Sequence, residues 1–273
     1  MDSIAPGRRV LAGALSLYVE QGGSGPPLVL IAGLGYASWC WLELRGELAR
    51  DASITAFDNR GTGRSDKPAG PYSIEMLADD VAALMRFLKL DTAHVLGHSM
   101  GGYIAQTFAL RHPERLRSLI LVGTGPGGPG AEAIPEETQK AWESARSLSP
   151  QDYARRTMPT SFAPGWTDAH PKEFESILAR RLEFPTPPAS WLAQYDACVE
   201  YFVRGIDVSK IRAPTTVIHG ELDRVVPHRN GVLIAERLPG AKFISLPRAG
   251  HLPMLEKPPA FAQLVRAHLE SVR

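Results

Sequence analysis

Short runs of apolar residues recur along the chain, separated by segments with the spacing of amphipathic helices. Each run spans four or five residues, which suits a buried strand and is too short for a buried helix. The runs are Leu28–Ala32, Ile54–Phe57, Ala93–Leu96, Ser118–Val122, Thr215–Ile218 and Phe243–Leu246. Continuous apolar strands that alternate with helices are typical of a mostly parallel sheet covered on both faces. We therefore predict an α/β fold.

The segments between these runs carry the helical signals. From Ser73 to Leu88 the apolar residues fall on one helical face, and Ser73 is suited to cap the first turn. Residues 39–50 and 104–111 predict two further helices, and His112-Pro113 ends the second of these. The last predicted helix carries an apolar stripe from Phe261 to Val272.

The alternation stops between about Pro126 and Asp207. A glycine- and proline-rich run, Gly125–Gly130, opens this stretch, and helical signals without a convincing strand follow. Ser149-Pro150-Gln151-Asp152, for example, places a capping serine before a proline at the first helical position. We therefore predict one α/β core, formed by residues 1–125 and 208–273, with a helical cap inserted at residues 126–207.

This predicted cap holds 10 of the 21 aromatic residues in about 30% of the chain. One interpretation is a small helical core, and the other is a lid whose aromatic rings face a pocket. We expect both, with about a third of the rings lining the pocket. The candidate pocket residues, including one outside the predicted cap, are Tyr36, Trp142, Phe162, Trp166, Trp191 and Tyr195.

Overall composition excludes several classes of protein. The formal net charge of +1 argues against a nucleic-acid binder, which usually carries a strong basic excess. No apolar stretch approaches the ~18 residues that a membrane span needs. The only cysteines, Cys40 and Cys198, form neither a disulfide framework nor a zinc motif, so a reduced, cytoplasmic context is expected. No histidine spacing indicates a metal site.

A candidate nucleophile lies between a predicted strand and a predicted helix, in Gly97-His98-Ser99-Met100-Gly101. A serine hydroxyl reacts only when it is held in the open and deprotonated by a neighbour. A sharp strand–turn–helix elbow holds it in the open, and glycines on both sides give room for that turn. We expect the side chain of His98 to pack beside the elbow rather than to take part in catalysis.

The two partners that such a serine needs follow later in the chain. Asp223 comes after the run ending at Ile218, and His251 comes after the next run. Because parallel strands share their carboxyl ends, all three residues are expected at one edge of the sheet. His251 would accept the Ser99 proton, and Asp223 would orient the imidazole. Glu221 is the alternative acid.

Two backbone N–H groups are expected to stabilise the developing oxyanion. One belongs to Met100, directly after the serine. The other lies in Ala32-Gly33-Leu34-Gly35, after the first predicted strand; we assign it to Leu34, with Gly35 as the alternative.

These motifs resemble those of the α/β-hydrolase superfamily over essentially the whole chain. The resemblance rests on Gly97–Gly102, Asp58–Ser65, Gly220–Asp223 and Ala249–His251. Among members, the chain is most similar to capped carboxylesterases and 3-oxoadipate enol-lactonase-like proteins. The resemblance implies an eight-stranded, mostly parallel sheet with helices on both faces and a helical cap. Many relatives have His-Gly where this chain has Ala32-Gly33, so the anchoring of that loop is expected to differ.

The sequence therefore predicts a cofactor-independent serine hydrolase that cleaves a small carboxylic ester or lactone through an acyl-enzyme. C–C bond hydrolysis or perhydrolysis with the same triad remains an alternative, as does a ligand receptor that hydrolyses slowly. A dinucleotide fingerprint near Gly33 lacks its third glycine. Arg155-Arg156 and Arg180-Arg181 are interpreted as solvated helix faces, although one of them could meet an acidic substrate group. The near-neutral charge favours uncharged or weakly charged esters. The oligomeric state stays open.

Overall fold

The computed structural model describes residues 7–145 and 147–272, and residues 1–6 of the predicted core lie outside this range. Eight strands form one sheet in the order β1-β2-β4-β3-β5-β6-β7-β8. From β4 to β8 neighbouring strands are parallel, whereas β1 pairs with β2 and β2 with β4 in antiparallel fashion. The strands are β1 (Arg8–Ala12), β2 (Leu15–Gly22), β3 (Pro27–Ile31), β4 (Ser53–Phe57), β5 (Ala93–His98), β6 (Leu116–Val122), β7 (Thr215–Gly220) and β8 (Lys242–Leu246).

The apolar runs correspond to β3 through β8, and the mostly parallel eight-stranded sheet is confirmed. The pattern did not reveal β1 and β2. Because these strands form one margin of the sheet, β1 alternates between exposed and buried residues, and β2 is buried only at Leu17, Tyr18 and Val19 and half-buried elsewhere. Arg8 and Arg9 begin β1, so no continuous apolar run marks it.

Helices cover both faces of this sheet, and successive strand residues point to opposite faces. Val29 and Val95 pack into a core beneath α2 (Ile74–Phe87) and α3 (Met100–Arg111). Leu28 and Leu96 pack into a second core beneath α1 (Leu42–Leu48) and α11 (Pro258–Ser271). The remaining core helices are α9 (His228–Arg237) and the short α10 (Pro253–Glu256), with 3-10 turns η1 (Ser38–Trp41), η2 (Pro113–Arg115) and η4 (Val208–Lys210).

Local signals set several helix ends. The Ser73 hydroxyl accepts a hydrogen bond from the N–H of Met76, so Ser73 caps α2 as predicted. The helix predicted over residues 39–50 divides into η1 and α1. The helix predicted from Ile104 begins four residues earlier, at Met100, directly after the elbow.

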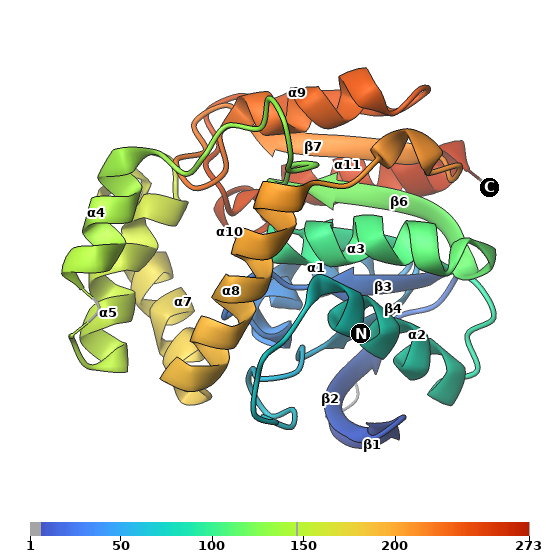
Figure 1. The fold of residues 1–273 in the computed structure, drawn as a ribbon, viewed down its shortest axis with the longest axis horizontal. Helices are drawn as coiled ribbons and strands as arrows, with labels where there is room; N and C mark the ends of the chain where they lie inside the picture. Colours follow the sequence, from blue (N-terminus) through green and yellow to red (C-terminus); the bar gives the residue numbers. More distant parts are fainter. Residues whose placement is uncertain (1–6, 146, 273) are drawn as a thin grey trace.

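Residues 126–207, within the connection between β6 and β7, are called the helical segment below. Its described residues contain helices and no strand: α4 (Glu136–Ser144), α5 (Pro150–Thr157), η3 (Met158–Ser161), α6 (Trp166–Ala169), α7 (Pro171–Glu183) and α8 (Pro188–Arg204). Ser149 caps α5 by accepting from the N–H of Asp152. Figure 1 shows these helices at the end of the sheet toward which the arrows of β6 and β7 point.

The two ends of the helical segment lie side by side. The N–H of Ile206 donates to the carbonyl of Pro126 at 3.0 Å, and the N–H of Gly128 donates to Phe202 at 2.8 Å. The chain therefore leaves the sheet and returns to it at one place. In the part of the chain that the model covers, no helix is both long and apolar enough to span a bilayer.

Candidate active site

Ser99 occupies a strained turn between β5 and α3. Its backbone angles are φ 56° and ψ −120°, a conformation that residues with a Cβ atom rarely adopt. A Cβ at Gly97 would lie 2.2 Å from the carbonyl oxygen of Gly101, and one at Gly101 would lie 2.1 Å from that of Ile31. Only glycine fits at both positions, so the sequence around Ser99 is suited to this tight elbow. The Ser99 side chain faces a cavity beyond the strand ends.

Asp223 and His251 meet at the same sheet edge. The Nδ1 atom of His251 lies 2.8 Å from Oδ2 of Asp223, and both side chains are buried. The other carboxylate oxygen accepts hydrogen bonds from the N–H groups of Val225 and Val226, at 2.8 and 2.9 Å. His251 lines the cavity that Ser99 faces. The fold thus brings the three predicted triad residues to one place.

The surroundings of Asp223 keep its carboxylate ionised. Burial raises its pKa, but the charge of His251 and the hydrogen bonds from His219 and His251 outweigh burial, so the pKa lies well below its ordinary value. His219 Nε2 lies 3.2 Å from Oδ2 of Asp223 and donates to the carbonyl of Val226 at 2.9 Å. An ionised Asp223 can accept the Nδ1 proton of His251, which leaves Nε2 of that ring free to accept a proton.

The alternative acid, Glu221, is placed differently. Glu221 is exposed, and its carboxylate accepts a hydrogen bond from the Ser245 hydroxyl at 2.9 Å. The carboxylate hydrogen-bonded to His251 belongs to Asp223. The geometry therefore favours Asp223 over Glu221.

His98 supports the backbone of the His251 loop. Its Nε2 donates to the carbonyl oxygen of His251 at 2.8 Å, and the two ring centroids are 4.6 Å apart. Burial, together with the charge of His251, lowers the pKa of His98 to about 3. His98 is therefore neutral near pH 7. This buried position beside the elbow agrees with the packing role that the sequence suggested, although the ring also lines the cavity.

Glu256, at the end of α10, holds the same loop and was not singled out by the sequence. Both of its carboxylate oxygens accept from the N–H of Gly250 at 3.0 Å, and one also accepts from Ala163 at 3.2 Å. The N–H of His251 donates to the carbonyl of Ser161 at 2.9 Å. The loop that carries His251 is thus fixed jointly by α10 and the helical segment.

The predicted oxyanion residues, Leu34 and Met100, line the cavity together with Ser99. The N–H of Gly35, the alternative to Leu34, already donates to Oε1 of Gln194 at 3.1 Å. Asn59 donates from its side-chain amide to the carbonyl of Ala32 at 3.0 Å. Asn59 thereby anchors the loop that carries Ala32-Gly33 in place of the more usual His-Gly.

Gln194, on α8, joins the loop that carries Gly35 to the loop that carries Arg60 and Thr62. The sequence did not predict this role. Gln194 is fully buried, and its Nε2 donates to the carbonyl of Arg60 at 2.8 Å and to the Thr62 hydroxyl at 3.1 Å. Since its Oε1 accepts from Gly35, one side chain bridges both core loops. A glutamine within a helix carries no local signal for such a role.

Asp58 and Arg60 brace the second of these loops. The carboxylate of Asp58 accepts from the N–H groups of Ser38 and Arg64 at 2.7 and 2.8 Å. Arg60 forms a two-pronged ion pair with Asp80. These contacts fix the backbone of the loop that follows β4.

The cavity that Ser99 faces has a volume of about 110 Å³. Four of the six candidate pocket residues line it: Tyr36, Trp142, Trp191 and Tyr195. Phe162 and Trp166 lie elsewhere, against our expectation. Their rings stack at 4.5 Å, and Phe162 also packs edge-on against Phe174, so both pack into the core that lies beneath α1 and α11.

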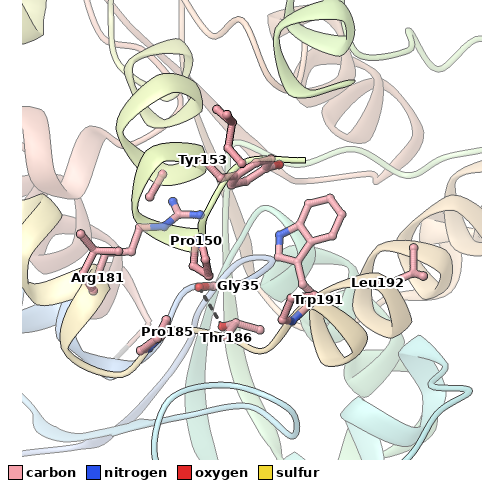
Figure 2. A pocket seen from close by; sticks show the side chains of 12 residues that line it. Gly35, Pro150, Tyr153, Arg181, Pro185, Thr186, Trp191 and Leu192 are labelled. Carbon is pink, nitrogen blue, oxygen red and sulfur yellow. Dashed lines mark hydrogen bonds between the residues drawn. The ribbon is translucent and has the colours of Figure 1, made fainter. Parts of the chain in front are cut away.

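A larger cavity of about 320 Å³ adjoins the first one. Figure 2 shows it between the side chains of Tyr153, Arg181 and Trp191, which line both cavities. The Thr186 hydroxyl donates to the carbonyl of Gly35 at its floor, at 3.3 Å. No group of three or more His, Cys, Asp or Glu residues suited to a metal ion occurs among residues 7–145 and 147–272.

Comparisons with known proteins agree with this fold. A family model for the alpha/beta hydrolase fold matches residues 26–258, so the chain belongs to this family. The chain is 29% identical over 269 residues to the 2-hydroxymuconate semialdehyde hydrolase of Pseudomonas sp. strain CF600, covering 95% of this chain and 92% of that protein. Over 260 residues it is 30% identical to the pimeloyl-[acyl-carrier protein] methyl ester esterase of Chromobacterium violaceum, covering 94% of this chain and 99% of that protein.

A solved structure points in the same direction. The enol-lactonase from Burkholderia xenovorans LB400 superposes with a TM-score of 0.80 at 25% identity, covering 96% of this chain and 100% of that one. These relatives are all hydrolases of the α/β fold, but their names differ in the bond that is cleaved. The names of these relatives have only hydrolase activity in common.

Proposed function

We propose that this protein is a serine hydrolase of small carboxylic esters or lactones. The observation that carries the proposal is the buried Asp223–His251 pair, joined at 2.8 Å, on the cavity that Ser99 faces from its strained turn. A strained elbow that presents a serine beside a carboxylate-bound imidazole is the arrangement that acyl transfer requires.

The proposed reaction begins when Ser99 Oγ attacks the substrate carbonyl and His251 Nε2 accepts the hydroxyl proton. The carbonyl oxygen becomes an oxyanion and accepts hydrogen bonds from the backbone N–H groups of Leu34 and Met100. His251 then donates its proton to the leaving alcohol oxygen, which leaves an ester on Ser99. Water attacks that ester with His251 as base, and the carboxylic acid departs. This chemistry needs no cofactor.

We further propose that the helical segment, residues 126–207, acts as a cap on a core formed by residues 1–125 and 208–273. Its two ends are hydrogen-bonded to each other beside the sheet, at Pro126 and Ile206. Its residues Trp142, Trp191 and Tyr195 line the cavity of Ser99. In this arrangement the core supplies the chemistry and the cap selects the substrate.

A second candidate function is hydrolysis of a carbon–carbon bond with the same triad. It is favoured by the 29% identity to a 2-hydroxymuconate semialdehyde hydrolase across nearly the whole chain. The two functions differ in the leaving group, which is an alcohol oxygen in one case and a carbanion in the other. Turnover of simple esters and of a vinylogous 1,5-diketone, measured side by side, separates them.

The proposal is tested by turnover of p-nitrophenyl butyrate by the wild type and by Ser99→Ala. We expect multiple turnovers by the wild type and a loss of at least about 10⁴-fold in the variant. The circular dichroism spectrum of the variant should match that of the wild type, which establishes that it folds. Unchanged turnover by Ser99→Ala would refute the assignment of the nucleophile. A single stoichiometric burst by the wild type would instead indicate a slow-hydrolysing receptor.

A further inference from the structure

Arg181 lies where the cavity of Ser99 meets the larger cavity. It belongs to α7, and together with Tyr153 and Trp191 it lines both spaces. Figure 2 shows its guanidinium pointing toward the interior of the larger cavity, on the side opposite the Trp191 ring. The sequence suggested that Arg180-Arg181 form a solvated helix face. That interpretation does not hold for Arg181, because its side chain lines both cavities.

The charge of Arg181 is left without a carboxylate. Its neighbour Arg180 pairs with Glu43, Arg155 on α5 pairs with Glu175, and Arg64 lies 3.5 Å from Glu183. Within residues 7–145 and 147–272, no carboxylate lies within ion-pair distance of Arg181. A guanidinium in a partly enclosed cavity loses hydration, and an anion bound beside it compensates for that loss.

The head of Arg181 is held in place by Tyr36. Its Cζ atom lies 4.7 Å from the centroid of the Tyr36 ring, so the positive charge faces the electron-rich ring. Tyr36 is buried and lines the cavity of Ser99. Its hydroxyl makes no hydrogen bond of normal geometry within the described residues. Burial raises the pKa of Tyr36, and the nearby Arg181 and Ser161 offset only part of that rise.

The rest of the larger cavity is mostly apolar. Besides Arg181, Tyr153, Trp191 and the Thr186–Gly35 pair at its floor, it is lined by aliphatic side chains and prolines, including Leu148, Pro150, Leu182, Pro185 and Leu192. Such a lining accommodates hydrocarbon, so the charged head of Arg181 is the one feature here that calls for an anion.

We propose that Arg181 forms an anion-binding subsite for a carboxylate carried by the ester substrate, with the hydrocarbon of that substrate in the larger cavity. This inference rests on the proposed ester hydrolysis and names its substrate class. A guanidinium can donate two parallel hydrogen bonds to one carboxylate, which an ammonium cannot. The subsite contrasts with the uncharged esters that the near-neutral net charge favours, because one cation at the cavity acts on the substrate more strongly than the net charge of the whole chain.

Two pairs of substrates test the subsite, each pair differing only in a terminal carboxylate. Monomethyl adipate and methyl hexanoate place the difference in the acyl group; 6-acetoxyhexanoate and hexyl acetate place it in the leaving group. For the wild type we expect kcat/KM to favour the charged member of one pair by about 10- to 100-fold, the range of a charge-assisted pair. The preference should weaken as salt is raised.

Three variants assign that preference to Arg181. Arg181→Met should bring the ratio of kcat/KM between charged and neutral partners close to one, and Arg181→Lys should retain part of it. Arg180→Met is the matched control, since Arg180 pairs with Glu43 and does not line either cavity; it should keep the wild-type ratio. A wild-type ratio near one in both pairs, or a ratio that survives Arg181→Met, would overturn the subsite while leaving ester hydrolysis intact.

Binding measured without turnover separates the subsite from the proposed function. In Ser99→Ala protein, titration calorimetry with both pairs should show the charged ester of at least one pair binding about 10-fold or more tightly than its neutral partner. The double variant Ser99→Ala, Arg181→Met should lose that difference. If the wild type hydrolyses neither ester, the proposed function fails and this titration still decides the subsite. Equal binding of the two partners in both pairs would overturn it.

Discussion

Two regions enclose the cavity of Ser99, and they are built differently. At the sheet edge, polar groups are fixed by short hydrogen bonds and by backbone contacts too close for any side chain, as between Gly97 and Gly101. In the helical segment, rings pack on rings: Trp191 stacks on Tyr195 at 5.2 Å and meets Tyr153 edge-on at 6.1 Å. Hydrogen bonds therefore fix the groups at the sheet edge, whereas van der Waals packing of aromatic rings holds the helical segment together.

This difference separates two roles. Directional bonds hold reacting groups in place, which proton transfer and oxyanion stabilisation require. Ring packing tolerates changes of shape and can adapt to different substrates at small cost in free energy. We therefore expect substitutions at the sheet edge to lower kcat, and substitutions in the helical segment to change substrate preference.

The largest effect is expected at the acid of the sheet edge. Asp223→Asn keeps the shape of the side chain but removes the charge that stabilises a protonated His251, so kcat for p-nitrophenyl butyrate should fall by about 10³- to 10⁴-fold. Glu221→Gln is the matched control, because Glu221 is exposed and bonded to Ser245. It should stay within about 2-fold of the wild type. Equal losses in both variants would remove the distinction between the two acids.

A smaller effect is expected where the two regions meet, at Gln194. Gln194→Leu removes the bonds to Gly35, Arg60 and Thr62, so the loop carrying Leu34 should lose its alignment with Met100. We expect kcat to fall by about 10- to 100-fold with little change in KM, since an oxyanion donor acts in the transition state. Gln151→Leu, at an exposed position of α5, is the control. A rise in KM at constant kcat would place Gln194 in substrate binding instead.

The smallest effect is expected on the free energy of unfolding at acidic pH, which should depend on the buried histidine His268 in the core. His268 is buried between Thr216 and Ser118, at 2.8 and 2.7 Å, and burial is the main cause that lowers its pKa to about 4. The unfolded chain, with a histidine pKa of about 6.5, binds a proton that the folded chain excludes. The stabilising contribution is therefore complete above about pH 6.5 and is lost as the pH falls toward 4.

Urea denaturation between pH 6 and pH 4.5 measures this contribution. The free energy of unfolding of His268→Gln should fall less steeply than that of the wild type, by up to about 1.4 kcal/mol per pH unit. His170→Gln, at an exposed position of the helical segment, should keep the wild-type slope. Identical slopes for wild type and His268→Gln would contradict a lowered pKa at His268.

The sequence indicated the sheet edge well because its signals are local. The glycines around Ser99 are required by close backbone approaches, and β3 through β7 appear as apolar runs since nearly all of their residues are buried. The edge strand β8 is only half-buried, and its run was recognised from Phe243, Ile244 and Leu246. The strands β1 and β2 gave no such run, because they lie at the margin of the sheet with partly exposed faces. Short sequence patterns therefore identify structural features that depend on residues close together in the chain.

The helical segment could be recognised but not resolved. Its ring contacts depend on helix packing, so the sequence could not separate Phe162 and Trp166, which stack on each other, from Trp191, which faces the cavities. Gln194 escaped notice for the same reason, and the sequence could not single out Arg181 among the four arginines that could meet an acidic substrate group. The partners of these two residues lie more than a hundred residues away, as Gly35 does from Gln194.

Covalent labelling tests the proposal that Ser99 is the nucleophile. Incubation with a fluorophosphonate should add one adduct per chain, located by peptide mass spectrometry on Ser99, because such probes trap a serine activated by a neighbouring base. Ser99→Ala should remain unlabelled at the same probe concentration. Labelling at another residue, or an adduct that persists in Ser99→Ala, would show that Ser99 is not the nucleophile.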